Sequence, residues 1–187
     1  MLDFDLVKFL IDNQIENLYP VSFKLKTAKV LVLETKNLSI SNKIANISSL
    51  RDFQYNGKIT LFQKDISSLK KQDIQNYRSK ISIGGGDDLL FHNMSIINNI
   101  ALPLRISNIS EQIIEKRIEE LFLWLNIKNM IYKEVTSLNE HEHKLLQIVR
   151  AVTTNPKILI LVNPLAFNSP FNEIILKLIN GLISYKT

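Results

Sequence analysis

The chain has 187 residues, of which 45% are hydrophobic and 22% charged, a balance typical of one globular domain with a sizeable core. It has no cysteine, which excludes disulfides and thiolate zinc sites. The net charge is +5, but the lysines are scattered and no basic stripe alternates with aromatic residues, so we expect no nucleic-acid partner.

The N-terminal third of the sequence predicts strands. Residues 1–14 are acidic and amphipathic, and they lack the basic region and cleavage site of a signal peptide. Residues 21–26, 29–34 and 57–63 are rich in apolar and β-branched side chains, which is typical of strands. Between the last two strands, residues 35–53 predict a loop that runs into a helix.

The middle of the chain predicts two helices around a glycine-rich strand end. Residues 67–80 have serine before a helical pattern, and residues 81–86, "ISIGGG", predict a short strand that runs into three glycines. Residues 107–127 then predict a helix with Ser110 as its N-cap. One face of this helix holds a row of apolar side chains, namely Ile113, Ile114, Ile118, Leu121, Phe122 and Leu125.

The C-terminal third predicts a helix, a fully buried strand and a closing helix. Residues 140–152 have apolar side chains at helical spacing, and residues 169–185 end the chain as a helix. Residues 156–162 hold the longest apolar run, which is far below the roughly 18 residues that span a membrane. The alternation of strands and helices predicts an α/β fold with a largely parallel sheet and a helical insertion. We expect a cytoplasmic location.

The segment "EHEH" (140–143) raises the question of a metal or acid–base site. On a helix His141 and His143 lie two residues apart and point to different sides, whereas helical ligands need a spacing of three or four. The two glutamates have the same problem as a catalytic pair. Acidic residues at the positive end of a helix dipole explain the pattern more simply. A small enzyme with a new site at His141, Glu142 and His143 is the alternative.

No other motif predicts chemistry. "GGGDD" (84–88) lacks the G-x-x-x-x-G-K-[ST] spacing of a phosphate-binding loop. The chain has no Gly-x-Ser-x-Gly element, and His92 is a lone histidine beside Phe91. The residues alone therefore predict no catalytic constellation, no metal site and no cofactor.

From Val21 onward, however, the order of elements resembles the ATPase domain of ATP-binding cassette (ABC) transporters. "YNGKITLFQKDISSLKKQDIQNYRSKISI" and "LLFHNMSIINNIALPLRI" resemble the family's segments before and after its Q-loop. "VTSLNEHEHKLLQIVRAVTTNPKILILVNPLAF" follows the frame of its signature and Walker B segments without a gap. The resemblance implies one truncated P-loop NTPase-like domain over 1–187, with a β-subdomain, a helical subdomain at 87–137 and the C-terminal part missing.

The residues that perform the family's chemistry are replaced in this sequence. The family's phosphate loop uses glycines to expose backbone N–H groups, a lysine for the phosphates and a hydroxyl for Mg²⁺. Counted back from Gly57, these places hold Thr35, Leu38, Ile40, Ser41 and Asn42. A β-branched isoleucine cannot replace a glycine that must expose its backbone, so we expect no ordinary nucleotide binding there.

Three more places differ from the family pattern. Gly86 stands at the Q-loop glutamine, and Val162 and Asn163 stand at the Walker B aspartate and the catalytic glutamate. The signature serine and glycines are replaced by Asn139, Glu140 and His141. The resemblance, combined with these replacements, implies a pseudo-ATPase that keeps the fold for binding and has no cofactor.

The resemblance also implies partners. In the family, the region after the Q-loop docks a helix of the integral-membrane permease, and the candidate docking residues are Leu89, Leu90, Phe91 and Met94. These residues would otherwise be core residues of the helical insertion. The protein would then sit on the inner face of the cytoplasmic membrane through its partner, and it could form a homodimer or a heterodimer with another ABC ATPase.

The subgroup within the family is less defined. "LLFHNMSIINNIALPLR" and "NPLAFNSP" resemble the ATPase of Mla-type phospholipid transport (MlaF). "ALPLRISNIS" is shared with the cell-division ATPase FtsE and with the lipoprotein-release ATPase. The alternatives to an Mla-like subunit are therefore an FtsE-like or lipoprotein-release subunit, a regulator that pairs with an active ATPase, and a decaying or truncated ATPase.

Overall fold

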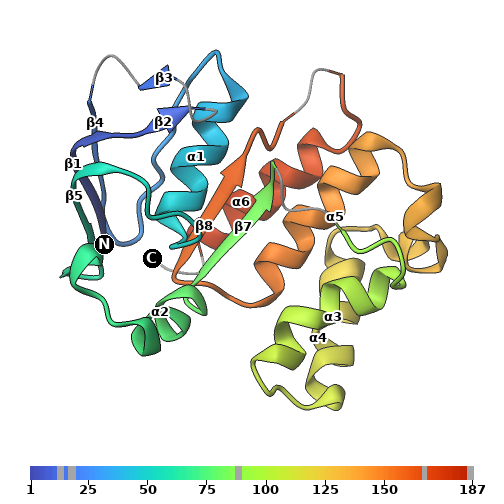
Figure 1. The fold of residues 1–187 in the computed structure, drawn as a ribbon. Coiled ribbons are helices and arrows are strands. Elements are labelled where there is room, and N and C mark those ends of the chain that lie inside the picture. The colour runs from blue at the N-terminus through green and yellow to red at the C-terminus, as the bar shows by residue number, and fades with distance from the viewer. Residues whose placement is uncertain (12–14, 17–19, 87–89, 166–167, 185–187) are drawn as a thin grey trace. The chain divides into compact units, whose positions relative to one another are not determined.

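The computed structural model describes residues 1–11, 15–16, 20–86, 90–165 and 168–184 (Figure 1). The chain divides into two compact units. The first unit holds Met1–Arg78 with Ile183–Thr187, and the second holds Ser79–Leu182.

The first unit is built on an antiparallel sheet with the strand order β4-β1-β5-β6. Its strands are β1 (Leu2–Lys8), β4 (Val21–Leu25), β5 (Asn56–Leu61) and β6 (Lys64–Asp65). Strand β1 buries Leu2 and Phe4 on one face, and the Phe4 ring stacks on Phe23 of β4 at 4.4 Å between centroids. This aromatic pair and the alternating burial hold the sheet together.

Short elements complete the first unit. They are the paired strands β2 (Leu10–Ile11) and β3 (Ile15–Glu16), helices α1 (Leu38–Ser48) and α2 (Lys71–Arg78), and the 3-10 helix η1 (Ile66–Ser68). Arg78 at the end of α2 donates from Nε and Nη2 to the carbonyl oxygen of Leu50, at 3.0 and 2.5 Å. This contact fixes the end of α2 to the turn after α1.

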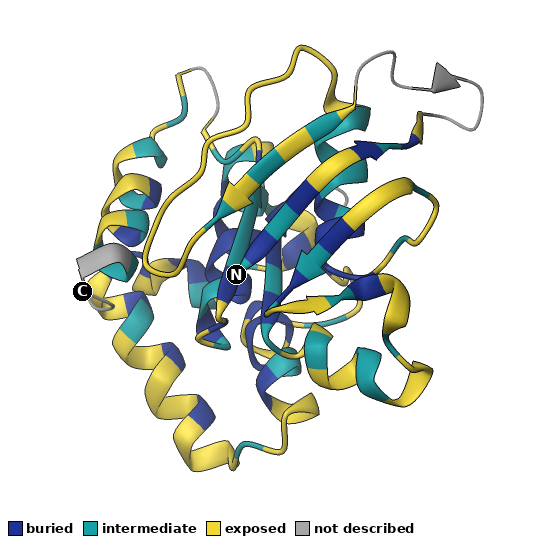
Figure 2. Cartoon of the chain, turned by 90° about the vertical axis from the view of Figure 1, so that its left-hand side faces the viewer, coloured by how far each residue is buried: buried dark blue, intermediate teal, exposed yellow. Residues whose placement is uncertain are grey.

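The expected strands of this unit are confirmed in part. The strand expected at 21–26 is β4, and the one expected at 57–63 is β5, which ends at Leu61 because Phe62 and Gln63 form a turn with positive φ. The strand expected at 29–34 is wrong: these residues belong to no strand, and residues 26–38 are all exposed (Figure 2). An apolar, β-branched run needs a hydrogen-bonded neighbour to become a strand, and no described residue supplies one here.

The second unit contains a parallel strand pair covered by helices. Strands β7 (Ile81–Gly85) and β8 (Ile158–Val162) run parallel in register from Ile81↔Ile158 to Gly85↔Val162. The helices are α3 (Ile96–Ile106), α4 (Glu111–Trp124), α5 (Glu140–Thr153) and α6 (Asn172–Ser184), with 3-10 helices η2 (Lys128–Tyr132) and η3 (Val135–Ser137). Helix α5 packs on β7, and α3 packs on both α5 and α4.

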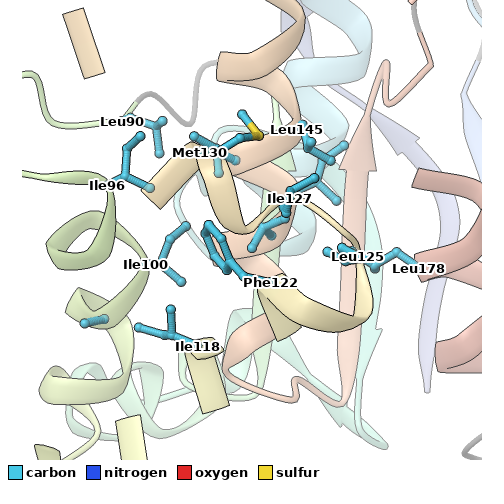
Figure 3. Close-up of a cluster of buried hydrophobic side chains, with 14 of the residues drawn as sticks. Leu90, Ile96, Ile100, Ile118, Phe122, Leu125, Ile127, Met130, Leu145 and Leu178 are labelled. Atoms are coloured by element: carbon cyan, nitrogen blue, oxygen red, sulfur yellow. The ribbon is translucent and has the colours of Figure 1, made fainter. Parts of the chain in front are cut away.

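The helices of this unit share one buried cluster. Figure 3 shows Ile118 and Phe122 of α4 near Ile100 of α3, with Leu145 of α5 and Leu178 of α6 in the same cluster. The expected face of α4 is therefore confirmed for Ile114, Ile118, Phe122 and Leu125, which are buried. It is wrong for Ile113, which is 48% exposed because it lies at the edge of the face.

Three further expectations need correction. Ser110 is the N-cap of α4 by position, but its side chain makes no capping hydrogen bond. Strand β8 is buried only at its two ends, Ile158 and Val162, and its three middle residues are partly exposed. The expected α/β architecture is present, but parallel pairing among the described strands is limited to β7 and β8. The expected insertion at 87–137 contains α3, α4, η2 and η3 where it is described.

Candidate functional site

The start of α1 occupies the place of the phosphate loop. The Oδ1 of Asn37 accepts the N–H of Ser39 at 2.8 Å, and the backbone oxygen of Asn37 accepts the N–H of Ser41 at 3.4 Å. Thr35 Oγ1 accepts the N–H of Asn37 at 3.2 Å. Because the N–H groups of Ser39 and Ser41 already donate hydrogen bonds to Asn37, they are not available to an anion.

The expected loop at 35–43 is therefore largely a helix. Leu38 and Ile40, at two of the glycine places, lie inside the first turn of α1, and none of residues 35–42 has a positive φ. Lys43 lies close to the lysine place, but its Nζ forms an ion pair with Asp52 at 2.7 Å. That side chain is only 15% exposed. Lys43 thus has a structural partner within the first unit.

In the second unit, the carboxyl ends of β7 and β8 lie together. Gly85 pairs with Val162, and a Cβ on Gly85 would lie 2.4 Å from the carbonyl oxygen of Val162. Gly86 follows in the left-handed region at φ 60°. The glycines thus bring two strands into close contact, and Gly86 adds no side chain to the site.

Val162 and Asn163 stand where the resemblance places two carboxylates. Val162 is 4% exposed and packs at the end of β8, and Asn163 is exposed with a φ of 46°. Ligand sites of parallel sheets lie outside the carboxyl ends of the strands. Among the described residues, no group of three or more histidines, cysteines or carboxylates could hold a metal ion. The residues present do not fit Mg²⁺ with a nucleotide.

The start of α5 is closed by a capping box. The Oδ1 of Asn139 accepts the N–H of Glu142 at 2.9 Å, and Glu142 Oε2 accepts the N–H of Asn139 at 3.1 Å. Lys133 donates to the other carboxylate oxygen of Glu142, which is 8% exposed. The hydrogen bond from Lys133 lowers the pKa of Glu142 against the opposing effect of burial, and the Asn139 N–H assists.

This arrangement sharpens the interpretation of the "EHEH" segment. Glu140 is exposed and His141 is partly exposed, as expected for a solvated helix start. Glu142 is not solvated, because its carboxylate accepts the N–H of Asn139 in the capping box. The signature places Asn139 and Glu140 therefore belong to a helix start at which the N–H groups of Asn139 and Glu142 already have partners.

His143 instead meets His92, a pair that the sequence does not predict. Their ring centroids lie 6.0 Å apart. Gln147 Nε2 lies 3.3 Å from His143 Nδ1. Burial, followed by the nearby His92 and Arg150, lowers the pKa of His143. The two histidines come from distant parts of the sequence, so only the fold brings them together.

The expected docking stretch divides into buried and exposed residues. Leu90 is 2% exposed and belongs to the buried cluster, so its expected contact with a partner is wrong. Phe91 is 48% exposed and Met94 is partly buried. Leu89 lies outside the described residues. Phe91 and Met94 therefore remain the docking candidates.

Asn99 holds this stretch in place, which the sequence analysis missed. It is fully buried, and its Oδ1 accepts the N–H of Phe91 at 2.7 Å. Its Nδ2 lies 3.0 Å from the oxygen of Phe91, 3.2 Å from that of Met94 and 3.1 Å from that of Ser95. A polar residue on the apolar face of α3 is the signal that could have identified it.

None of the described helices is both long and apolar enough to cross a membrane.

Comparison with known proteins supplies the context for this geometry. Residues 40–166 match the family model described as ABC transporter. A methionine import ATP-binding protein of Bacillus thuringiensis is 28% identical over 104 residues, which are 56% of this chain and 31% of that protein. A spermidine/putrescine import ATP-binding protein of Desulfitobacterium hafniense is 28% identical over 97 residues, which are 52% of this chain and 28% of that protein. The matches thus span less than a third of these relatives.

Two solved structures show the same fold. They are dimeric structures of the ATP-binding cassette MJ0796, one of them a post-hydrolysis state bound to ADP and Pi. Each has a TM-score of 0.84 at 18% identity, over 99% of this chain and 84% of the solved chain. The expected α/β cassette fold is therefore confirmed.

Proposed function

Because the chain belongs to the ABC transporter family, we propose that it is a cassette subunit that docks on a membrane permease and does not hydrolyse ATP. The observation that carries this proposal is the start of α1. A phosphate loop must offer free N–H groups and a lysine, whereas the Ser41 N–H donates to Asn37 and Lys43 pairs with Asp52.

The end of β8 supports the absence of hydrolysis. The side chain of Val162 offers no oxygen to Mg²⁺, and Asn163 cannot act as a general base because its amide does not accept a proton near neutral pH. At the start of α5, Glu140 would repel a phosphate group by its negative charge. These replacements affect separate steps of the family's reaction, so a single compensating residue would not restore it.

Calorimetric titration of the chain with Mg-ATP, together with a phosphate-release assay, tests this proposal. An active cassette measured alongside shows that the assay works. We expect neither a binding isotherm nor phosphate release above the buffer rate. Micromolar binding with turnover would refute the proposal.

Phe91 and Met94 are the residues we propose for docking. Phe91 is exposed, and the stretch that presents it is fixed by Asn99, so the ring can enter an apolar groove or receive a partner helix at little cost in entropy. We expect Phe91→Glu to abolish co-purification with a co-expressed permease. Ile113→Glu is the matched control, because Ile113 is equally exposed at 48% but lies on α4. Retention of the permease by Phe91→Glu would exclude this interface.

Within the family, we propose an Mla-like phospholipid-transport subunit. The support is the resemblance of "LLFHNMSIINNIALPLR" and "NPLAFNSP" to that subgroup. The curated relatives above are named for methionine and polyamine import instead. The genes beside this one discriminate: a permease with a lipid-binding partner supports the Mla-like role, an FtsX-like permease supports an FtsE-like role, and an amino-acid permease contradicts both.

A second candidate is a regulator that pairs with an active ATPase. The observation that favours it is that the solved structures of this fold described above are dimeric. Light scattering of the chain with and without a candidate ATPase tests the pairing. A mass that equals the sum of the two chains supports it, and two separate masses reject it.

A further inference from the structure

An apolar run in the first unit is exposed to solvent. After the turn at Thr27 and Ala28, residues 29–35 continue without a further turn or bend. The run holds four consecutive apolar side chains that are each at least 38% exposed, namely Val30, Leu31, Val32 and Leu33. A contiguous apolar surface of this kind marks a place where the chain meets a partner or a membrane.

The backbone of this run is open as well. No hydrogen bond between described residues uses a backbone N–H or C=O of residues 29–34. Successive side chains of an extended chain point to opposite sides, so exposure of four consecutive residues leaves both sides of the run uncovered. A flat protein surface would cover one of these sides, whereas a lipid interface surrounds an inserted run on both.

Lysines flank the apolar run at both ends. Lys26 and Lys29 precede its apolar side chains, Lys36 follows them, and Glu34 is the only carboxylate in residues 26–38. All of these charged residues are exposed. Among the described residues, none of them forms an ion pair. Their surplus positive charge is complementary to anionic lipids, which attract basic residues to a membrane surface.

We propose that residues 26–36 bind directly to an anionic lipid surface. The side chains from Val30 to Leu33 enter the boundary between headgroups and acyl chains, and the long lysine side chains keep their ammonium groups beside the lipid phosphates. Insertion is shallow, because the unpaired backbone groups need water or headgroups as hydrogen-bond partners. This contact is separate from the proposed docking residues Phe91 and Met94, which belong to the second unit.

Flotation of the tag-free 187-residue chain with lipid vesicles tests the proposal. Vesicles of phosphatidylcholine with about 30% phosphatidylglycerol supply the anionic surface, and phosphatidylcholine alone is the neutral reference. We expect the chain to bind the anionic vesicles about tenfold or more tightly than the neutral ones. Raising NaCl from about 0.1 M to about 0.5 M should release it, because salt screens the attraction.

Two sets of lysine substitutions assign the binding to this run. The test variant combines Lys26→Gln, Lys29→Gln and Lys36→Gln. The matched control combines Lys64→Gln, Lys70→Gln and Lys71→Gln. The control lysines are exposed and belong to the same unit, so the net charge falls equally in both variants. We expect the test variant to lose about tenfold or more in affinity for anionic vesicles, and the control less than about threefold.

A fluorescent label reports insertion directly. Because the chain has no cysteine, Val32→Cys can be labelled selectively with an environment-sensitive dye, whose emission should shift to the blue on anionic vesicles. Tyr132→Cys is the matched control, since Tyr132 and Val32 are both 83% exposed but Tyr132 belongs to the second unit. Its label should not shift. Thermal melts verify that each variant folds.

Several outcomes would overturn the proposal. One is absence of binding to the anionic vesicles. Another is an equal loss of binding in the two lysine variants, which would assign the attraction to net charge alone. A third is an equal emission shift of the two labels. A dimer in light scattering without vesicle binding would assign the run to contact with a second copy of the chain instead.

Discussion

At the scale of single residues, Gly85 at the end of β7 and Gly86 after it have structural roles that the family's catalytic pattern does not require. Gly85 has a φ of 84°, and a Cβ there would lie 2.4 Å from the carbonyl oxygen of Val162. We expect Gly85→Ala to lower the free energy of unfolding by about 2 kcal/mol or more, because strained backbone and overpacking add. Urea denaturation measures this change.

Gly86→Asn serves as the control for Gly85→Ala. Gly86 also has a positive φ, of 60°, and asparagine tolerates the left-handed region better than alanine. The expected loss is below about 1 kcal/mol. Equal losses in the two variants would show that contact with Val162 contributes nothing.

The sequence alone indicates which residues of the family pattern are replaced, but it does not indicate which residues contact one another. The replacements at Ser41, Val162 and Asn163 follow from counting along the family frame. The ion pair of Lys43 with Asp52 and the contact of His143 with His92 depend on how the chain folds back. The sequence pattern paired His143 with His141 instead, because sequence periodicity describes one helix and not its neighbours.

At the scale of elements, helix starts with and without a side-chain cap allow a direct comparison. Asn139 caps α5 and supports the buried Glu142, whereas Ser110 starts α4 without a side-chain bond. We expect Asn139→Ala to cost about 1–2 kcal/mol of unfolding free energy, and Ser110→Ala less than about 0.5 kcal/mol. Denaturant titration of both variants measures the difference. Equal costs would contradict the capping box.

Elements were predictable where local pattern and packing agree. Helices α4, α5 and α6 follow their apolar periodicity, and β4, β5 and β8 their apolar runs. Strand β1 was missed because its alternation breaks at Leu6, where a bulge brings φ to 50°. Helix α3 was missed because Asn98, Asn99 and Pro103 interrupt its pattern. The run at 29–34 was predicted as a strand but forms none, because a strand depends on a hydrogen-bonded neighbour that its own sequence does not supply.

At the scale of the whole molecule, hydrolysis in this family needs several parts at once. The phosphate-loop places lie in the first unit, and the Walker B and signature places lie in the second. Catalytic groups that act as one device lose their effect together when any of them is missing. Restoring one place should therefore not restore activity.

The double variant Val162→Asp with Asn163→Glu tests this argument. We expect no Mg-ATP binding and no phosphate release above the buffer rate, because Ser41 and the helical start of α1 remain. We also expect lower stability, by roughly 1–3 kcal/mol, because Val162 is 4% exposed and a carboxylate there loses its hydration. Asn163→Glu alone changes an exposed residue and checks that the fold survives. Turnover by the double variant would show that the start of α1 still binds phosphate, and it would remove the main support for the proposed inactivity.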